Sequence, residues 1–280
     1  MFTTRPEIRG TFGVVTSTHW IASQVGMAML ERGGNAFDAA VAAGFCLQVV
    51  EPHLCGPAGE VPIIFHSAAN RRIEVLCGQG PAPAAASISA FRHLGLDAVP
   101  GSGVVPGSFG AWLTLLRDHG RLRLEEVMAP AIGYAEHGHP LLPGVARALA
   151  ELKEAFTTEW PTSAPVWLPG GEAPRSHALF RNPALAATWK RILAEAGQGA
   201  REVQIERALA AWYEGFVAET IDRFGQAEAL MDSSGRRHKA LLRGQDMAGW
   251  RPAYEAPATL DYHGWTICKT RPWGQGPVLL

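Results

Sequence analysis

Cysteines and unbalanced charge are both scarce in this sequence of 280 residues. The four cysteines, at positions 46, 55, 77 and 268, include no C-x-x-C pair. This pattern excludes a disulfide framework and a cysteine zinc site, and it predicts free thiols that are buried at Cys46 and Cys268. With 25 basic and 26 acidic residues the net charge is −1, so electrostatics give no support for a nucleic-acid or anionic-membrane partner.

Long apolar runs are also absent. None approaches the ~20 residues that a membrane-spanning helix requires. Residues 1–6 contain no basic segment followed by an apolar stretch, as a signal peptide would. We therefore expect no membrane partner and a soluble protein in the cytoplasm, with the periplasm as the alternative. Because 47% of the residues are hydrophobic and only 18% are charged, the composition predicts a folded domain and not a disordered chain.

The sequence lacks the common motifs of catalytic and cofactor sites. It has no G-x-S-x-G elbow, no G-x-x-x-x-G-K phosphate loop and no H-E-x-x-H zinc motif. Gly78 and Gly80 begin a dinucleotide fingerprint, but Pro83 stands where its third glycine would be. His137 and His139 flank a glycine, but no carboxylate or cysteine completes a metal site with them, and such a pair is more typical of a helix end. We therefore expect no cofactor, no metal and no nucleophile in these residues.

The N-terminal half of the sequence predicts helices followed by a hairpin. Apolar periodicity predicts helices over residues 21–30 and 36–50, separated by a glycine pair. Asn35 is the expected N-cap of the second helix, with Asp38 in capping-box position. Since this helix is almost entirely apolar, we expect part of it to face layers outside the chain. Two short apolar runs, residues 61–66 and 73–77, then predict a β-hairpin.

The remainder of the chain alternates between turns and helices and ends in strands. Prolines and small residues predict irregular backbone over residues 81–107 and a turn-rich segment over 160–175. Helical periodicity covers residues 109–116, 124–136, 145–156, 183–196 and 203–224, and two β-like pieces lie within residues 258–270.

The final residues resemble an interrupted element. Residues 272–277 are typical of a strand-to-helix corner, and residues 278–280 of the first apolar turn of a helix. A buried helix of one turn lacks the rest of its apolar face. We therefore expect these residues to be one piece of a larger product, the alternative being a natural terminus in a frayed turn.

The order of many short motifs resembles that of the gamma-glutamyltranspeptidase family over essentially the whole chain. Each motif is weak alone, but their shared order is specific. The matching segments are residues 14–17 (VVTS), 22–23 (AS), Gly26, 30–42 (LERGGNAFDAAVA), 50–52 (VEP), 82–83 (AP), 105–107 (VPG), 129–132 (APAI), 135–136 (AE), 182–188 (NPALAAT), 212–215 (WYEG), 246–248 (DMA) and 262–265 (YHGW).

The resemblance implies an α+β fold, the four-layer αββα sandwich of N-terminal nucleophile hydrolases. In that family a precursor cleaves itself, and a Thr or Ser becomes the first residue of the smaller β subunit, where its own α-amine serves as the base. This chain resembles only the α part. The resemblance therefore implies that residues 1–280 are the α-subunit portion of a single αββα domain, that a separate β subunit completes it, and that the chain contains no catalytic residue.

Two departures from the family pattern concern the substrate. Transpeptidases have an Arg-Glu pair just before the Thr-Ala-Pro that follows the hairpin, and the arginine clamps the α-carboxylate of the glutamyl group. This chain has Gln79 and Gly80 there, and a neutral amide cannot form a charged bidentate pair. Where the family has Pro-Pro-Ser-Ser-Gly-Gly, residues 272–277 read PWGQGP, so Trp273 offers an apolar wall.

These departures resemble the cephalosporin acylases of the transpeptidase-like class. The resemblance implies an amide hydrolase whose α and β subunits remove a glutaryl-type acyl side chain from a cephalosporin nucleus, with Gln79, Gly80, Trp273 and Gln275 as substrate-binding residues. Its other partner is then a small acyl amide. The alternatives are a gamma-glutamyl hydrolase or transpeptidase, a non-catalytic homologue, and a purely structural role for Gln79 and Trp273.

Overall fold

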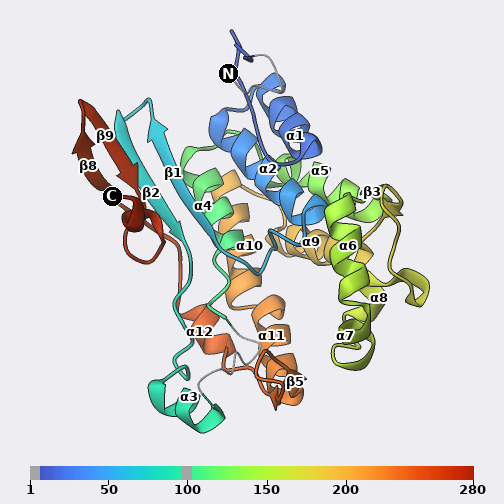
Figure 1. Cartoon of the computed structure of the whole chain (residues 1–280). Helices are drawn as coiled ribbons and strands as arrows, with labels where there is room; N and C mark the ends of the chain where they lie inside the picture. The colour runs from blue at the N-terminus through green and yellow to red at the C-terminus, as the bar shows by residue number, and fades with distance from the viewer. Residues whose placement is uncertain (1–6, 96–102) are drawn as a thin grey trace.

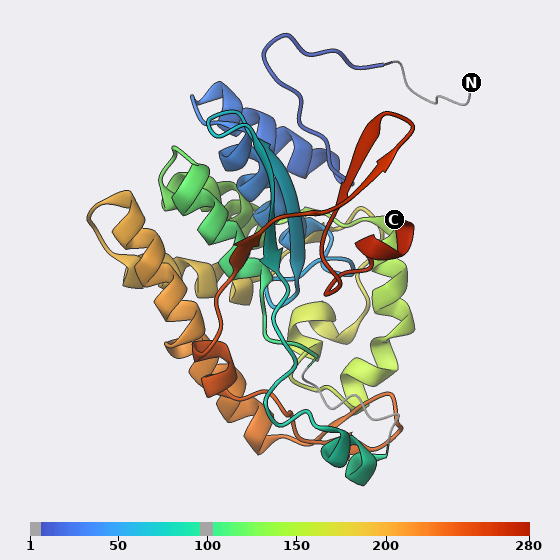
Figure 2. The ribbon, with the colours of Figure 1, turned by 90° about the vertical axis from the view of Figure 1, so that its left-hand side faces the viewer.

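The computed structural model describes residues 7–95 and 103–280, and it has an α+β fold in which helices cover one face of a small sheet (Figures 1 and 2). The helices are α1 (Trp20–Glu31), α2 (Ala36–Val50), α3 (Ile88–Leu94), α4 (Ser108–His119), α5 (Leu124–His137), α6 (Pro143–Glu151), α7 (Lys153–Thr158), α8 (Ala164–Trp167), α9 (Pro183–Ala196), α10 (Arg201–Tyr213), α11 (Phe216–Ala227) and α12 (Gly244–Ala248). The 3-10 turns are η1 (Pro169–Gly171) and η2 (Gly276–Leu279).

The strands form one three-stranded sheet and three two-stranded pairs. They are β1 (Val61–Ser67), β2 (Arg72–Gly78), β3 (His139–Pro140), β4 (Leu179–Phe180), β5 (Leu230–Met231), β6 (Arg237–His238), β7 (Ala253–Glu255), β8 (Ala258–Tyr262) and β9 (Trp265–Lys269). The sheet has the order β1-β2-β7 with antiparallel neighbours, and β8 pairs with β9 as a separate hairpin. The hairpin predicted at residues 61–77 is therefore confirmed.

The turn between α1 and α2 is built as the sequence predicts. Gly33 adopts a φ of +89°, which an L side chain rarely tolerates, and it ends α1. Asn35 Oδ1 accepts hydrogen bonds from the N–H groups of Phe37 and Asp38 at 2.9 and 3.2 Å. Asp38 Oδ2 accepts one from the Asn35 N–H at 2.7 Å, which completes the capping box.

The helical core explains why α2 is apolar on nearly all sides. This helix packs against α1, α4 and α5, and 11 of its residues are buried within the chain itself. Aromatic pairs continue the core: the rings of Phe109 and Trp212 are stacked with centroids 4.3 Å apart, and those of Phe45 and Trp189 meet edge to face with centroids 5.7 Å apart. The expectation that α2 faces layers outside the chain is therefore wrong, because neighbouring helices of this chain already cover it.

Several predicted boundaries also differ from the structure. The helix predicted over residues 203–224 is two helices, because Gly215 takes an extended conformation after α10 and its N–H bonds back to Ala210 at 2.8 Å. The helix predicted over residues 145–156 is divided between α6 and α7 at Leu152. Short helices interrupt both segments predicted to be irregular, and residues 96–102 of the first lie outside the described residues.

Other expectations concern the thiols, the histidine pair and membrane spans. All four cysteines are free, and Cys46 is buried whereas Cys268 is half-buried.

Gly138 caps α5 with a φ of +98°, which confirms the helix end predicted between His137 and His139. Within residues 7–95 and 103–280, no three acidic, histidine or cysteine side chains are grouped to hold a metal, and no helix has the length and hydropathy to cross a membrane.

Candidate functional site

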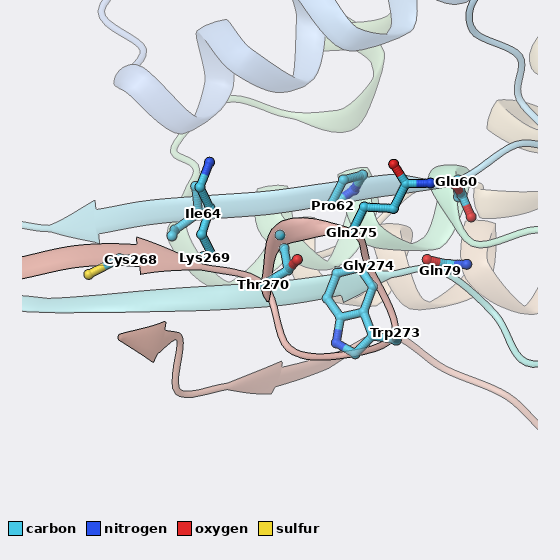
Figure 3. Close-up of a pocket in the computed structure, with 11 residues that line it drawn as sticks. Glu60, Pro62, Ile64, Gln79, Cys268, Lys269, Thr270, Trp273, Gly274 and Gln275 are labelled. Atoms are coloured by element: carbon cyan, nitrogen blue, oxygen red, sulfur yellow. The ribbon is translucent and has the colours of Figure 1, made fainter. Parts of the chain in front are cut away.

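A pocket of about 650 Å³ lies at the open end of the β1–β2 hairpin, where the C-terminal segment crosses it (Figure 3). It brings together three of the four residues that the sequence singled out, Gln79, Trp273 and Gln275. The other lining residues are Glu60, Pro62, Ile64, Cys268, Lys269, Thr270, Gly274 and Gly276. A volume of this size suits a small organic molecule, since ligand pockets commonly measure roughly 300–1,000 Å³.

Strand pairing determines which side chains meet at this end of the hairpin. Val61 pairs with Gly78 at the open end of the hairpin. Glu60 and Gln79 are the next residues beyond this pair, so they lie at the same end. Gln79 is half-buried, and Cys77 Sγ contacts its carbonyl oxygen at 3.5 Å. The antiparallel register therefore directs an amide and a carboxylate to one pocket, although neither belongs to a recognisable motif.

Trp273 is held in place by β7, the outer strand of the sheet. Its indole Nε1–H donates a hydrogen bond to Glu255 Oε1 at 2.5 Å. This bond satisfies the polar atom of the ring and leaves its apolar surface to line the pocket with Pro62 and Ile64. A fixed aromatic wall next to aliphatic side chains suits the methylene groups of an acyl chain.

The loop that carries Trp273 and Gln275 is wrapped tightly around Thr270. A Cβ atom on Gly274 would lie 2.7 Å from Thr270 Oγ1, and one on Gly276 would lie 2.9 Å from the same atom. The Gly274 N–H also bonds to the Arg271 carbonyl at 3.0 Å. Glycine allows this close approach, because a side chain at either position would have to displace the Thr270 side chain or the loop that carries the two pocket residues.

Gly80 does not line the pocket. It is buried directly behind Gln79, and a Cβ atom there would lie 2.2 Å from the Val105 carbonyl oxygen. Transpeptidases have a glutamate at this position, and such a side chain does not fit the backbone seen here. The structure therefore separates Gly80 from the other three predicted residues and gives it a packing contact.

The charged groups of the pocket belong to no motif in the sequence. Figure 3 shows Glu60 and Lys269 at opposite ends, with Thr270 and Trp273 between them and the Gln275 side chain extending toward Glu60. Glu60 precedes β1 and Lys269 ends β9, so only their positions at strand ends could have marked them.

Polar and charged side chains surround the pocket, and among the described residues that line it there is no histidine. Next to it, burial raises the pKa of the Cys77 thiol, and the carboxylates of Glu255 and Glu60 act in the same direction. A protonated thiol is a poor nucleophile. The arrangement is therefore that of a binding surface with amide donors, one carboxylate and one ammonium group.

Comparison with known proteins covers nearly the whole chain. The family model described as Gamma-glutamyltranspeptidase matches residues 22–280. The Glutathione hydrolase-like YwrD proenzyme of Bacillus subtilis is 30% identical over 275 residues, which are 96% of this chain and 48% of that protein. The chain thus spans about half the length of this relative.

Solved structures agree with this match. The structure of LmbA2991HD is similar with a TM-score of 0.95 and 56% identity, over 100% of this chain and 49% of that one. The cephalosporin acylase from Bacillus halodurans is similar with a TM-score of 0.77 and 27% identity, over 98% of this chain and 50% of that one. These similarities confirm the predicted α+β fold of N-terminal nucleophile hydrolases, of which this chain is about half.

Proposed function

Because this chain belongs to the gamma-glutamyltranspeptidase family, we propose that it is the α-subunit part of an amide hydrolase that removes glutaryl-type acyl groups, including those of cephalosporins. In this proposal the remainder of the precursor supplies the β subunit and its N-terminal Thr or Ser nucleophile. This chain contributes the acyl-binding surface, with Gln79, Trp273 and Gln275 in contact with substrate and Gly80 behind them.

The observation that carries the proposal is the position of Gln79 in the pocket wall. In the transpeptidases that this chain resembles, an arginine stands at the position of Gln79 and pairs with the α-carboxylate of a glutamyl group. The amide of Gln79 donates only neutral hydrogen bonds, which are roughly half as strong as charge-assisted ones. Glutaryl and gamma-glutamyl groups both end in a carboxylate, but only the gamma-glutamyl group adds an α-ammonium, so a glutaryl group brings one charged group fewer to this neutral side chain. The cephalosporin acylase among the similar structures supports the same substrate class.

Exposed apolar side chains near the C-terminus support the proposed β subunit. Trp265 is 77% exposed in β9, and Val278 and Leu279 in η2 are 90% and 69% exposed. Figure 2 shows the β8–β9 hairpin projecting away from the helices. Monomers rarely leave apolar patches of this kind in water. We infer that the second half of the αββα domain covers them.

One comparison favours a second candidate function. The similar protein from Bacillus subtilis is described as glutathione hydrolase-like, which suggests gamma-glutamyl hydrolysis for this chain as well. Glu60 agrees with this candidate, because a carboxylate in the pocket offers a partner for an α-ammonium group. A non-catalytic homologue is the third candidate.

The decisive experiment uses the enzyme produced from the full-length precursor. It compares two substrates that share one leaving group and differ in the acyl group. We expect kcat/KM for glutaryl-p-nitroanilide to exceed that for gamma-glutamyl-p-nitroanilide by about tenfold or more, since only the gamma-glutamyl group carries an α-ammonium and an unpaired charged group costs on the order of 1–3 kcal/mol. A ratio near or below one would assign the protein to the gamma-glutamyl candidate.

Denaturing electrophoresis of the same preparation tests the non-catalytic candidate. Self-cleavage predicts two bands, and replacement of the new N-terminal residue of the smaller band predicts one band and no hydrolysis. An uncleaved precursor without activity on either anilide would exclude the proposed hydrolase.

A further inference from the structure

A buried hydrogen bond joins the side chains of Gln48 in α2 and Ser108 in α4. Both residues are 3% exposed, and Gln48 Nε2 donates to Ser108 Oγ at 2.9 Å. The other amide atom, Gln48 Oε1, has no hydrogen-bond partner within the described residues. An unpaired buried oxygen costs stability, and a methionine would fill the same space without it. Stability alone therefore does not account for an amide at position 48, and such exceptions are typical of functional sites.

The bond from Gln48 fixes the N-terminus of α4, because Ser108 is the first residue of that helix. The N–H groups at the start of a helix have no partner inside it. In α4 the N–H groups of Gly107 and Ser108 both donate to the Gly59 carbonyl, at 3.0 and 2.9 Å. Glu60, which lines the pocket, follows Gly59 directly. The start of α4 therefore holds the loop that leads to one pocket residue.

The same turn of α4 also contacts the end of β2. A Cβ atom on Gly107 would lie 2.1 Å from the Gly78 carbonyl oxygen and 3.1 Å from the Gln79 nitrogen. The backbone of Gly107 is thus packed directly against the residues that lead into the pocket at Gln79. Figure 3 shows Glu60 and Gln79 at the same end of the pocket. Residues 107–108 therefore determine how these two side chains are placed relative to each other.

We propose that Gln48 is a positioning residue for the candidate pocket and that it acts through Ser108. Neither residue is among the described residues that line the pocket, so neither contacts the ligand there. The inference rests on the proposed function in one respect, namely that this pocket binds the acyl group, and it holds for either acyl group. A displacement of ~1 Å in a binding site can cost up to about a hundredfold in rate, so a small shift of the turn is measurable.

The test uses Gln48→Met in the enzyme produced from the full-length precursor. Methionine has a similar length and volume but cannot donate to Ser108. We expect KM for the anilide that the wild type hydrolyses faster to rise about three- to tenfold, with kcat within about twofold, because the nucleophile belongs to the other half of the precursor. Ser108→Ala should give the same rise, and the double variant should be no worse than either single one.

Asp38→Asn is the matched control because it acts on the same two helices at their opposite ends. Asp38 lies in the first turn of α2 and accepts hydrogen bonds from the N–H groups of Arg121 and Leu122, just after α4. This variant should lose stability and leave KM unchanged. A purely structural role for Gln48 predicts instead that KM changes in both variants or in neither.

Hydrogen exchange gives a readout that does not depend on turnover. We expect Gln48→Met to accelerate exchange of the Gly107 and Ser108 amides by about tenfold, relative to residues 113–116 in the middle of α4, because only the helix start is released. Asp38→Asn should cause no such local difference.

The outcomes separate this inference from the proposed function. An unchanged KM in Gln48→Met overturns the positioning role, and additive effects in the double variant overturn the route through Ser108. A wild-type enzyme that prefers the gamma-glutamyl anilide rejects the proposed acylase and leaves the test of Gln48 intact. If the wild type hydrolyses neither anilide, exchange alone decides, and equal exchange at residues 107–108 in the wild type and Gln48→Met overturns the inference.

Discussion

The backbone of Gly80 lies directly against that of Val105, so that a Cβ atom on Gly80 would stand 2.2 Å from the Val105 carbonyl oxygen. The same two segments are joined by a hydrogen bond from the Val105 N–H to the Pro81 carbonyl at 2.9 Å. This contact fixes the path of the chain as it leaves β2. Since Gln79 is the preceding residue, the contact also positions the pocket amide.

We expect Gly80→Ala to destabilise the protein by about 1–3 kcal/mol, the usual cost of forcing a group into a packed site. Urea unfolding of the full-length protein measures this change. Gly133→Ala in α5 is the control, because no atom lies within 4 Å of the added Cβ and alanine favours helices. Equal stability of the two variants would contradict the close contact at Gly80.

Gln79→Arg should favour acyl groups that end in a carboxylate. A guanidinium group provides a bidentate partner for the terminal carboxylate that glutaryl and gamma-glutamyl groups share and that a pentanoyl group lacks. The quantity to measure is the ratio of kcat/KM between glutaryl- and pentanoyl-p-nitroanilide, for which we expect a rise of about tenfold or less, because no glutamate at position 80 supports the arginine. An unchanged ratio, together with full glutaryl hydrolysis by Gln79→Ala, would leave Gln79 with a packing role only.

His139 should make the protein sensitive to acid. It is buried, neither ring nitrogen makes a hydrogen bond of good geometry among the described residues, and burial lowers its pKa to about 4, with His19 adding to this effect and the Tyr134 backbone opposing it. The unfolded chain, with a histidine pKa of ~6.5, binds the proton first as pH falls. The free energy of unfolding should therefore decrease between pH 6.5 and 4, by about 2 kcal/mol from pH 7 to pH 5.

Urea unfolding at pH 7 and pH 5 checks this pH dependence in the full-length protein. His139→Phe should lose less stability between the two pH values than the wild type, whereas His93→Gln, at an exposed position in α3, should lose as much. A wild-type protein whose free energy of unfolding is the same at both pH values would refute a neutral buried His139.

Asp38→Asn should weaken the junction between α2 and α4. The buried carboxylate accepts hydrogen bonds from the N–H groups of Asn35 at 2.7 Å, Arg121 at 2.9 Å and Leu122 at 3.0 Å. An amide retains one acceptor oxygen and turns donors toward donors, so we expect a loss of about 2–3 kcal/mol. Thermal unfolding measures it, with the exposed Glu31→Gln of α1 as control. Identical melting of both variants would show that the carboxylate bonds contribute little.

Residues 1–280 expressed alone should be inactive and prone to aggregation. The side chains of Trp265, Val278 and Leu279 are apolar and largely exposed, which water does not favour. Light scattering and size-exclusion chromatography check this, with co-expression of the second half of the precursor expected to restore a single soluble species. A monodisperse chain that melts cooperatively without the second half would contradict the proposed partner.

Local sequence was sufficient for much of the secondary structure. The capping box at Asn35 and Asp38, and the hairpin of β1 and β2, depend on interactions between residues close in the chain. The division of α10 and α11 at Gly215 was not predicted, because a glycine within an apolar periodic segment is compatible with either one helix or two.

The sequence by itself determined the family, the α+β class and the identity of the residues that depart from the family pattern. Only the tertiary structure decided that Gln79, Trp273 and Gln275 share one pocket while Gly80 lies behind it. It also placed Glu60 and Lys269 at opposite ends of that pocket. The physical reason is that strand register and the crossing of the C-terminal loop join residues distant in sequence, and no local pattern specifies such contacts.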